Sequence, residues 1–173
     1  MSGLSCAFTG HRPQRYSFGF DEAHADCGKL KLAIATQIAA LAMDGFTVFY
    51  TGMAQGADIW CAESVLALRE HTPELRLIAA LPYDRQAKGW TAAMQERYHG
   101  ILVRCDEVVY VSREYKRGCL FQRDRWLVDN ADMLLAVYDG KPKGGTAYTV
   151  SYAKKKGKQV VVIDPDFFTA APL

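Results

Sequence analysis

Six short apolar runs alternate with longer amphipathic segments along the chain, and this alternation constrains the fold more than any other feature. The runs are mostly continuous rather than alternating in polarity, as is typical of strands that are covered on both faces of a sheet. Strands that alternate with helices are joined by crossovers, so the pattern predicts a doubly wound, mainly parallel sheet. The predicted strands cover residues 4–9, 46–50, 75–81, 107–111, 133–138 and 159–163.

The segments between these runs have the apolar spacing of helices. Leu30, Ile34 and Ile38 recur every four residues on one face of the first segment, and Gly45 follows it as a helix stop. We therefore expect a single-domain, Rossmann-like α/β fold with about six strands and with helices on both faces of the sheet. The short tail after Ile163 predicts a frayed end. The expected helices cover residues 26–44, 57–70, 91–104, 117–130 and 146–156.

Composition places the chain among ordinary globular domains. Of the 173 residues, 50% are hydrophobic and 23% are charged, which excludes a disordered or fibrous chain and fits one domain over residues 1–173. No apolar run reaches the ~18 residues of a membrane span and the N-terminus lacks a secretory signal, so we expect a cytoplasmic protein without membrane contact. The net charge of +2 predicts no strong attraction to nucleic acid. Five cysteines without a CxxC pair predict reduced thiols and no metal site.

Ligands of doubly wound sheets bind at the carboxyl ends of the strands, so the residues that follow each run are the candidates for a site. After the first run, His11 and Arg12 bring a donor and a positive charge that suit an anion, unless they are only solvated. After the second run, two glycines straddle a helix start, where backbone N–H groups can bind a phosphate or the glycines can serve tight packing. Asp58 in the first helical turn can cap the helix or accept hydrogen bonds from a ribose.

The turn after the fifth run is the strongest candidate for phosphate binding. Gly144 and Gly145 permit a close backbone approach, and Thr146 adds a hydroxyl at the helix start. Lys141 and Lys143 add positive charge, although flexibility of the loop would also explain the glycines. Neither GK[ST] nor GxGxxG occurs at these turns, so the standard ATPase and dinucleotide fingerprints are absent.

Residues from other segments can complete this site. Arg123, on the helix expected at 117–130, can pair with a phosphate or form a solvated ion pair. Pro82-Tyr83 and Trp90 follow the third run and can stack on a base or serve packing. The lysine run at 154–158 is expected to be a solvated helix end. The candidate ligand-binding residues are therefore Thr9, Gly10, His11, Arg12, Thr51, Gly52, Gly56, Ala57, Asp58, Pro82, Tyr83, Arg123, Asp139, Gly140, Gly144, Gly145 and Thr146.

Four segments of the chain together resemble one protein family. They are FTGHRP at 8–13, TGMAQGAD at 51–58, the segment at 123–132 and AVYDG…GGTAYTVSYA at 136–153. Their order, and their places at the ends of the expected elements, are similar to the YpsA-like branch of the SLOG superfamily, which is named after Smf/DprA and LOG proteins. The resemblance covers nearly the whole chain and implies a Rossmann-like fold that binds nucleotides or nucleotide-derived ligands across the strand ends.

The resemblance also bears on catalysis. LOG-type members are phosphoribohydrolases whose PGGxGTxxE motif supplies a glutamate shortly after the threonine. When Gly145-Thr146 is matched to that GT pair, the glutamate position is Thr149. The usual RN pair of the family reads Arg123-Asp124 in this sequence. The resemblance therefore implies a binding protein more strongly than a hydrolase that uses this glutamate.

Three functions follow as hypotheses. The first is a cytoplasmic protein that binds a nucleotide, or an ADP-ribose- or NAD-like derivative, with a phosphate at Gly144, Gly145 and Thr146. The second is a phosphoribohydrolase-type N-glycosidase that acts on nucleoside 5′-monophosphates, with Asp58 and Arg123 as candidate catalytic residues. The third, which the DprA relatives imply, is single-stranded DNA binding. We expect no required cofactor, although a magnesium ion can bind through ligand phosphates. The sequence leaves open whether the protein forms a homodimer.

Overall fold

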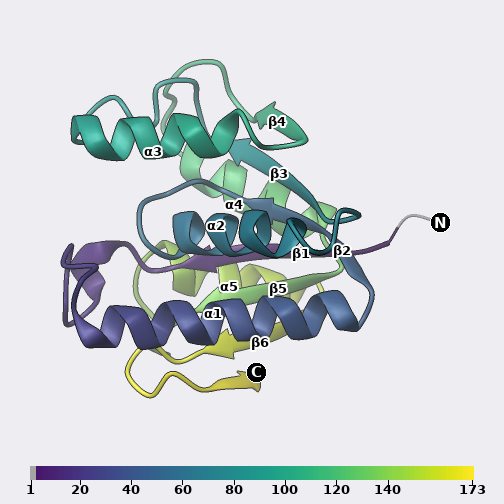
Figure 1. Cartoon of the computed structure of the whole chain (residues 1–173). Coiled ribbons are helices and arrows are strands. Elements are labelled where there is room, and N and C mark those ends of the chain that lie inside the picture. The colour runs from purple at the N-terminus through teal and green to yellow at the C-terminus, as the bar shows by residue number, and fades with distance from the viewer. Residues whose placement is uncertain (1–2) are drawn as a thin grey trace.

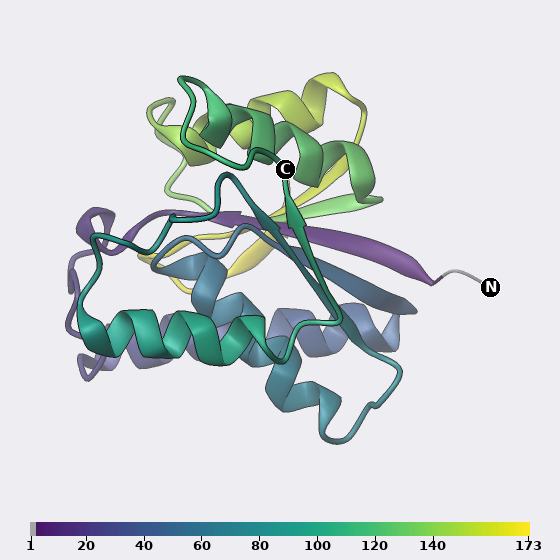
Figure 2. The same cartoon turned by 90° about the horizontal axis from the view of Figure 1, so that it is seen from above.

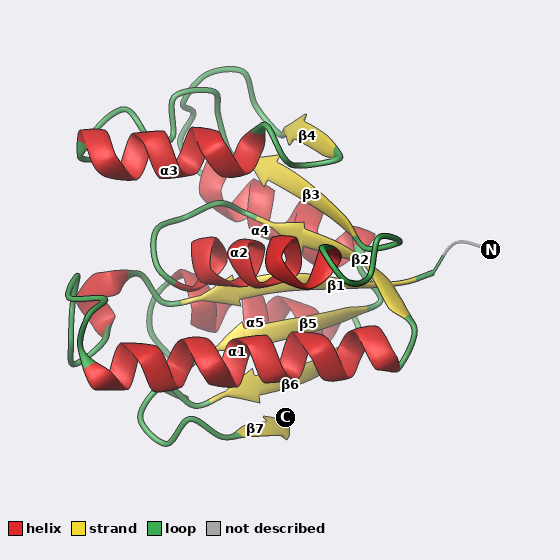
Figure 3. Ribbon diagram, in the orientation of Figure 1, coloured by secondary structure: helices red, strands yellow, loops and turns green. Residues whose placement is uncertain are grey.

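A computed structural model describes residues 3–173, and a seven-stranded sheet forms its centre. The strand order is β4-β3-β2-β1-β5-β6-β7, in which every pair is parallel except β6 and β7 (Figure 3). The predicted doubly wound, mainly parallel α/β fold is confirmed, with seven strands in place of about six. The strands are β1 (Leu4–Gly10), β2 (Phe46–Thr51), β3 (Arg76–Leu81), β4 (Glu107–Tyr110), β5 (Met133–Val137), β6 (Gln159–Ile163) and β7 (Ala170–Pro172).

The helices cover both faces of this sheet. Figures 1 and 2 show α1, α2 and α3 on one face and α4 and α5 on the other. Each of the five expected helices is present, with ends within two residues of the predicted ones. Their bounds are α1 (Ala25–Met43), α2 (Ala57–Arg69), α3 (Ala92–Leu102), α4 (Cys119–Asn130) and α5 (Gly145–Lys155), and a short 3₁₀ turn, η1 (Pro13–Arg15), follows β1.

The prediction of a frayed tail is wrong. Residues after Ile163 turn back and pair with β6, where Ile163 lies opposite Ala170 and Val161 lies opposite Pro172. The Asp164 carboxylate makes this turn, because it accepts the backbone N–H groups of the second and third residues after it at 2.8 and 3.2 Å. β7 carries small, exposed residues, so its sequence has no apolar pattern that would indicate a strand.

The core lies on both faces of the sheet, as the continuous apolar runs predict. Leu30, Ile34 and Ile38 of α1 are fully buried against the face that α1, α2 and α3 cover. Leu134 of β5 and Val150 of α5 belong to a second cluster on the other face. No helix within residues 3–173 combines the length and the apolar character needed to cross a membrane.

The order of the strands positions the site. From β1 the chain adds β2, β3 and β4 on one side, and it then adds β5 and β6 on the other side of β1. The strand order therefore reverses between β1 and β5. Gly10 ends β1 opposite Val137 of β5. A Cβ at Gly10 would clash with the Cβ of Ala57 and lie 3.1 Å from that of Val137. Glycine here therefore lets α2 pack against the ends of both strands.

Candidate functional site

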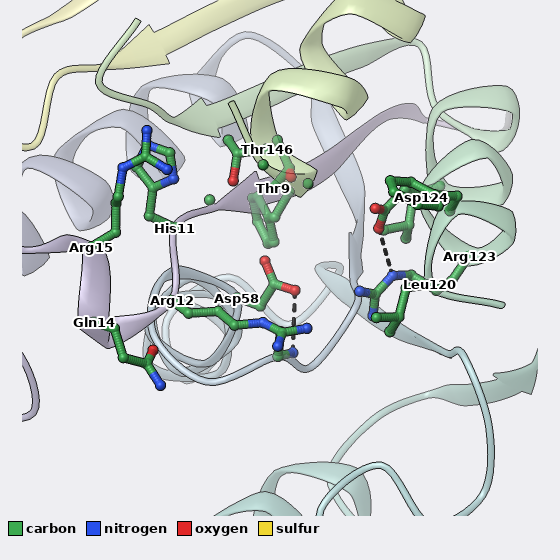
Figure 4. Close-up of a pocket in the computed structure, with 17 residues that line it drawn as sticks. Thr9, His11, Arg12, Gln14, Arg15, Asp58, Leu120, Arg123, Asp124 and Thr146 are labelled. Atoms are coloured by element: carbon green, nitrogen blue, oxygen red, sulfur yellow. Dashed lines mark hydrogen bonds and ion pairs between the residues drawn. The ribbon is translucent and has the colours of Figure 1, made fainter. Parts of the chain in front are cut away.

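A cavity of about 480 Å³ lies at the carboxyl ends of β1 and β5, where the strand order reverses. This volume is within the range of small-molecule sites. Residues from β1, η1, the turn before α2, α4 and the start of α5 surround it (Figure 4). The lining residues are Phe8, Thr9, Gly10, His11, Arg12, Gln14, Arg15, Ala54, Asp58, Leu120, Phe121, Arg123, Asp124, Leu127, Gly144, Gly145 and Thr146.

Arg123 of α4 is held rigidly in the wall of this cavity. Its side chain is 5% exposed, Nη1 donates to the carbonyl of Gly52, and Nε donates to Asp124 Oδ1 at 2.8 Å. A Cβ at Gly52 would lie 2.7 Å from Arg123 Cζ, so only glycine leaves room for the guanidinium. Within residues 3–173, Nη2 has no hydrogen-bond partner, and it remains available to an anion.

Asp58 lies in the first turn of α2 and is 6% exposed. Its Oδ2 accepts the backbone N–H of Ala54 at 3.2 Å and braces the turn between β2 and α2. Burial raises the pKa of Asp58 from 3.8 to about 6, against the opposing effect of the Arg123 charge. The other oxygen, Oδ1, has no hydrogen-bond partner in the described part of the chain. It can therefore accept a hydrogen bond from a ligand hydroxyl.

The start of α5 faces the cavity without a capping side chain. Gly144, at the N-cap, has φ of 92°, and no side chain caps the helix. A Cβ at Gly145 would have Asp124 Oδ2 as its nearest neighbour, at 4.0 Å, so the space in front of this turn is open. Thr146 is 6% exposed and lines the cavity. The free N–H groups and the positive end of the helix dipole make this turn suited to an anion.

Thr149 does not face the cavity. It is 1% exposed, and its hydroxyl donates to the Gly145 carbonyl at 2.8 Å, inside α5. The position at which the resemblance places a catalytic glutamate thus carries a side chain that is engaged with the helix backbone. No acid or base reaches the cavity from this position.

Arg15 joins the two strand-end loops that border the cavity. Its Nε and Nη2 donate to the two carboxylate oxygens of Asp139 at 2.9 and 3.3 Å, and Nη1 donates to the Lys143 carbonyl at 3.4 Å. The backbone N–H of Asp139 donates to His11 Nε2 at 3.1 Å. Burial lowers the pKa of His11, against the opposing effect of Asp139. His11 and Asp139 therefore fix the loops to each other.

The structure brings about half of the predicted ligand-binding residues into one cavity, namely Thr9, Gly10, His11, Arg12, Asp58, Arg123, Gly144, Gly145 and Thr146. Four others, Thr51, Gly52, Gly56 and Ala57, support its wall from behind: Thr51 Oγ1 donates to the Asp58 carbonyl, and the backbone N–H of Ala57 donates to the His11 carbonyl. The remaining four lie outside this lining. Asp139 and Gly140 line a neighbouring depression beside α5, Tyr83 lines other cavities, and Pro82 is buried.

Sequence reasoning missed several lining residues. Arg15 and Gln14 belong to η1, a short turn outside the strands and helices that the sequence predicts. On α4, Leu120, Asp124 and Leu127 line the cavity together with Arg123. These four residues have the i, i+3, i+4, i+7 spacing of one helical face, so the signal was present in the sequence. Within residues 3–173, no group of three His, Cys, Asp or Glu side chains could hold a metal ion.

The lysine run lies at the end of α5 that is remote from the cavity. The helix has 11 residues, which separates its ends by about 16 Å. Lys156 pairs with Asp129 at 3.1 Å, and Lys158 donates to the Ala131 carbonyl at 2.7 Å. Single-stranded DNA binding stays a prediction, and its signature would be an affinity that falls steeply with salt concentration.

Together, the fold and the cavity define a doubly wound α/β domain with a crevice at the reversal of its strand order, lined by arginine side chains and the start of α5. The YpsA family model, described as the YspA SLOG family, matches residues 6–166, and the chain belongs to this family. UPF0398 proteins of Bacillus thuringiensis (strain Al Hakam) and Bacillus cereus (strain AH187) are similar to it. Each is 30% identical over 154 residues, which cover 88% of this chain and 83% of the relative. The resemblance seen in the sequence is thus confirmed, and family membership indicates a nucleotide-related binding role in general.

Proposed function

We propose that this protein binds a nucleotide or a nucleotide derivative, including the ADP-ribose- and NAD-like ligands expected from the sequence, with a phosphate at the start of α5. One observation carries the proposal: the uncapped start of α5 and the buried Arg123 line the same cavity. Each of these groups favours a negative charge. Their convergence on one cavity supports an anionic small molecule as the ligand.

The fixed position of Arg123 favours one bound phosphate group over loosely associated counterions. Gly52 and Asp124 fix the guanidinium before any ligand arrives, so little side-chain entropy is lost on binding. Arg12 adds a second guanidinium at the same cavity. Two arginines and a helix start together match the several oxygens and the charge of a phosphate group.

The rest of a nucleotide finds complementary groups in the same cavity. The free Oδ1 of Asp58 can accept a hydrogen bond from a ribose hydroxyl. Leu120, Phe121 and Leu127 give one wall an apolar surface against which a base can pack. The site therefore combines an anion-binding end, a hydrogen-bond acceptor and an apolar wall.

Calorimetric titration with AMP, ADP-ribose and NAD tests this proposal on a variant that should fold normally. Gly145→Asp places a carboxylate at a helix start without a steric clash, where the dipole stabilises it and where it would join the nearby Asp124 carboxylate in repelling a bound phosphate. Gly145→Asn is the matched control, because it has nearly the same shape without the charge. We expect the Asp variant to bind at least about tenfold more weakly than the Asn variant. Equal affinities of the two variants, or no binding of any of the three ligands to the wild type, would contradict the proposal.

One observation also favours a second candidate function, hydrolysis of an N-glycosidic bond. Asp58 is a buried carboxyl group with a pKa near 6 that lines the cavity beside Arg123. Such a group can donate a proton to a departing base while water adds to the ribose carbon. Chromatography of nucleoside 5′-monophosphates after incubation with the protein would detect free base. Release that Asp58→Asn abolishes would establish this activity, and intact nucleotides after long incubation would exclude it.

A further inference from the structure

A second cavity adjoins the first along the strand ends. It has a volume of about 460 Å³ and shares Arg12, Gln14, Ala54 and Leu120 with the first cavity as lining residues. Its remaining walls come from Gln55 in the turn before α2, from the loop between η1 and α1 and from the loop between β3 and α3. Because the two volumes share one side, a ligand in the first cavity can extend into the second without leaving the protein surface.

Arg12 stands at the boundary between these two cavities. It is exposed and makes neither an ion pair nor a side-chain hydrogen bond within residues 3–173. Figure 4 shows its side chain extending from the end of β1 along the floor of the first cavity, near Asp58. An unpaired guanidinium between two cavities suits phosphate groups that link two parts of one ligand.

Trp90 gives the second cavity an aromatic wall in a fixed orientation. Its ring meets the buried Tyr98 edge-on, with centroids 5.2 Å apart and planes at 81°. Gln95 Nε2 donates to the Trp90 carbonyl at 3.0 Å, which holds the backbone of the loop. Trp90 is only partly buried and lines the cavity, as does Tyr83, which meets Tyr115 edge-on at 5.4 Å. Trp90 is thus held by a buried ring, whereas Tyr83 contacts a ring that is itself exposed.

Gln86 connects the second cavity to the anion site of the first. Its Nε2 donates to the carbonyls of Gly52 and Met53 at 3.2 and 3.1 Å, and the Gly52 carbonyl also accepts Arg123 Nη1. One carbonyl therefore fixes both the arginine of the first cavity and a lining residue of the second. The two cavities keep a defined position relative to each other.

We infer that the second cavity is a subsite for an aromatic ring, and that the ligand carries two ring systems joined by phosphate groups that lie across Arg12. This inference rests on the proposed function, because it assigns the rest of the ligand whose first phosphate lies at α5. The ring packs against Trp90 and Tyr83, and the phosphates pass from the start of α5 to Arg12. A mononucleotide fills the first cavity alone.

Titration with AMP, NAD and diadenosine diphosphate tests the subsite. We expect the better of the two-ring probes to bind the wild type about 10- to 100-fold more tightly than AMP, which is the contribution of one stacked ring and one added phosphate contact. Trp90→Leu should lower the ratio of the two affinities to the part that the added phosphate contact contributes. Trp126→Leu is the matched control, since Trp126 lies on α4, packs edge-on against Tyr50 and lines neither cavity, and it should leave the ratio unchanged. Arg12→Gln, in an exposed loop, should weaken the binding of AMP and should weaken that of the two-ring probes more, because they place an additional phosphate at this residue, so that the ratio falls.

The outcomes separate this inference from the proposed function. AMP that binds to the wild type and fails to bind to Gly145→Asp, with no gain for either two-ring probe, would overturn the second subsite and leave the nucleotide site in place. A gain that survives both Trp90→Leu and Arg12→Gln would also overturn it. If no probe binds at all, both proposals fail.

Discussion

Replacing Asp58 with Asn should change how the stability of the protein depends on pH. The carboxyl group is buried, and its pKa rises from 3.8 to about 6 in the folded state. Because the folded state prefers the protonated form, Asp58 does not lower the free energy of unfolding below pH ~4. Between pH ~4 and ~6 it lowers this free energy increasingly, and above that range the loss is constant. A difference of about two pKa units corresponds to about 3 kcal/mol of unfolding free energy.

Asn has nearly the shape of the protonated carboxyl group and can still accept the N–H of Ala54. We therefore expect wild type and Asp58→Asn to be equally stable near pH 4, and the variant to be more stable by about 3 kcal/mol above pH 6. Urea denaturation at several pH values between 4 and 8 measures this difference. Asp44→Asn, at the exposed C-cap of α1, controls for the loss of one negative charge. The same difference in stability at pH 4.5 and at pH 7.5 would refute the reasoning.

Two further predictions concern the packing of β1 against α2 and the anchoring of the loop before α1. Gly10→Ala should lower the free energy of unfolding by about 1–3 kcal/mol, because the new Cβ clashes with that of Ala57; unchanged thermal denaturation would contradict this. Arg97 holds Glu22 of the loop before α1 and Glu63 of α2, with bonds of 2.6 to 3.1 Å, so Arg97→Met should loosen the loop and cost on the order of 1 kcal/mol. Limited proteolysis should cleave residues 11–24 faster in this variant, and an unchanged cleavage rate would count against the role.

The elements of the fold could be predicted because their signals are local. Continuous apolar runs indicate buried parallel strands, and Leu30, Ile34 and Ile38 lie on the buried face of α1 as their spacing requires. β7 has no such signal, because its exposed residues are ordered by pairing with β6 and by the Asp164 turn. A strand that depends on its neighbour for stability leaves no apolar pattern in its own sequence.

Site residues that directly follow a strand or begin a helix could be predicted from the sequence. Residues whose role depends on a contact with a distant part of the chain could not. Arg123 and Gly145 lie in the cavity as expected from charge and from the glycine pair. The role of Gly52, which is to admit the Arg123 guanidinium, depends on a contact between residues 71 positions apart. Arg15 likewise meets Asp139, 124 positions away, and no local pattern in η1 indicates this pair.

An NMR titration of ¹⁵N-labelled protein with AMP shows most directly whether a phosphate binds at the start of α5. We expect the backbone amides of Gly145 and Thr146 to show the largest shifts, because the phosphate would contact them, and the Nε–H of Arg123 to shift as well, because the phosphate would bind Nη2 of the same guanidinium. The Gly145→Asp variant should lose these shifts under the same conditions. Shifts confined to the lysine run at 154–158, or an unchanged spectrum at millimolar AMP, would contradict phosphate binding at α5.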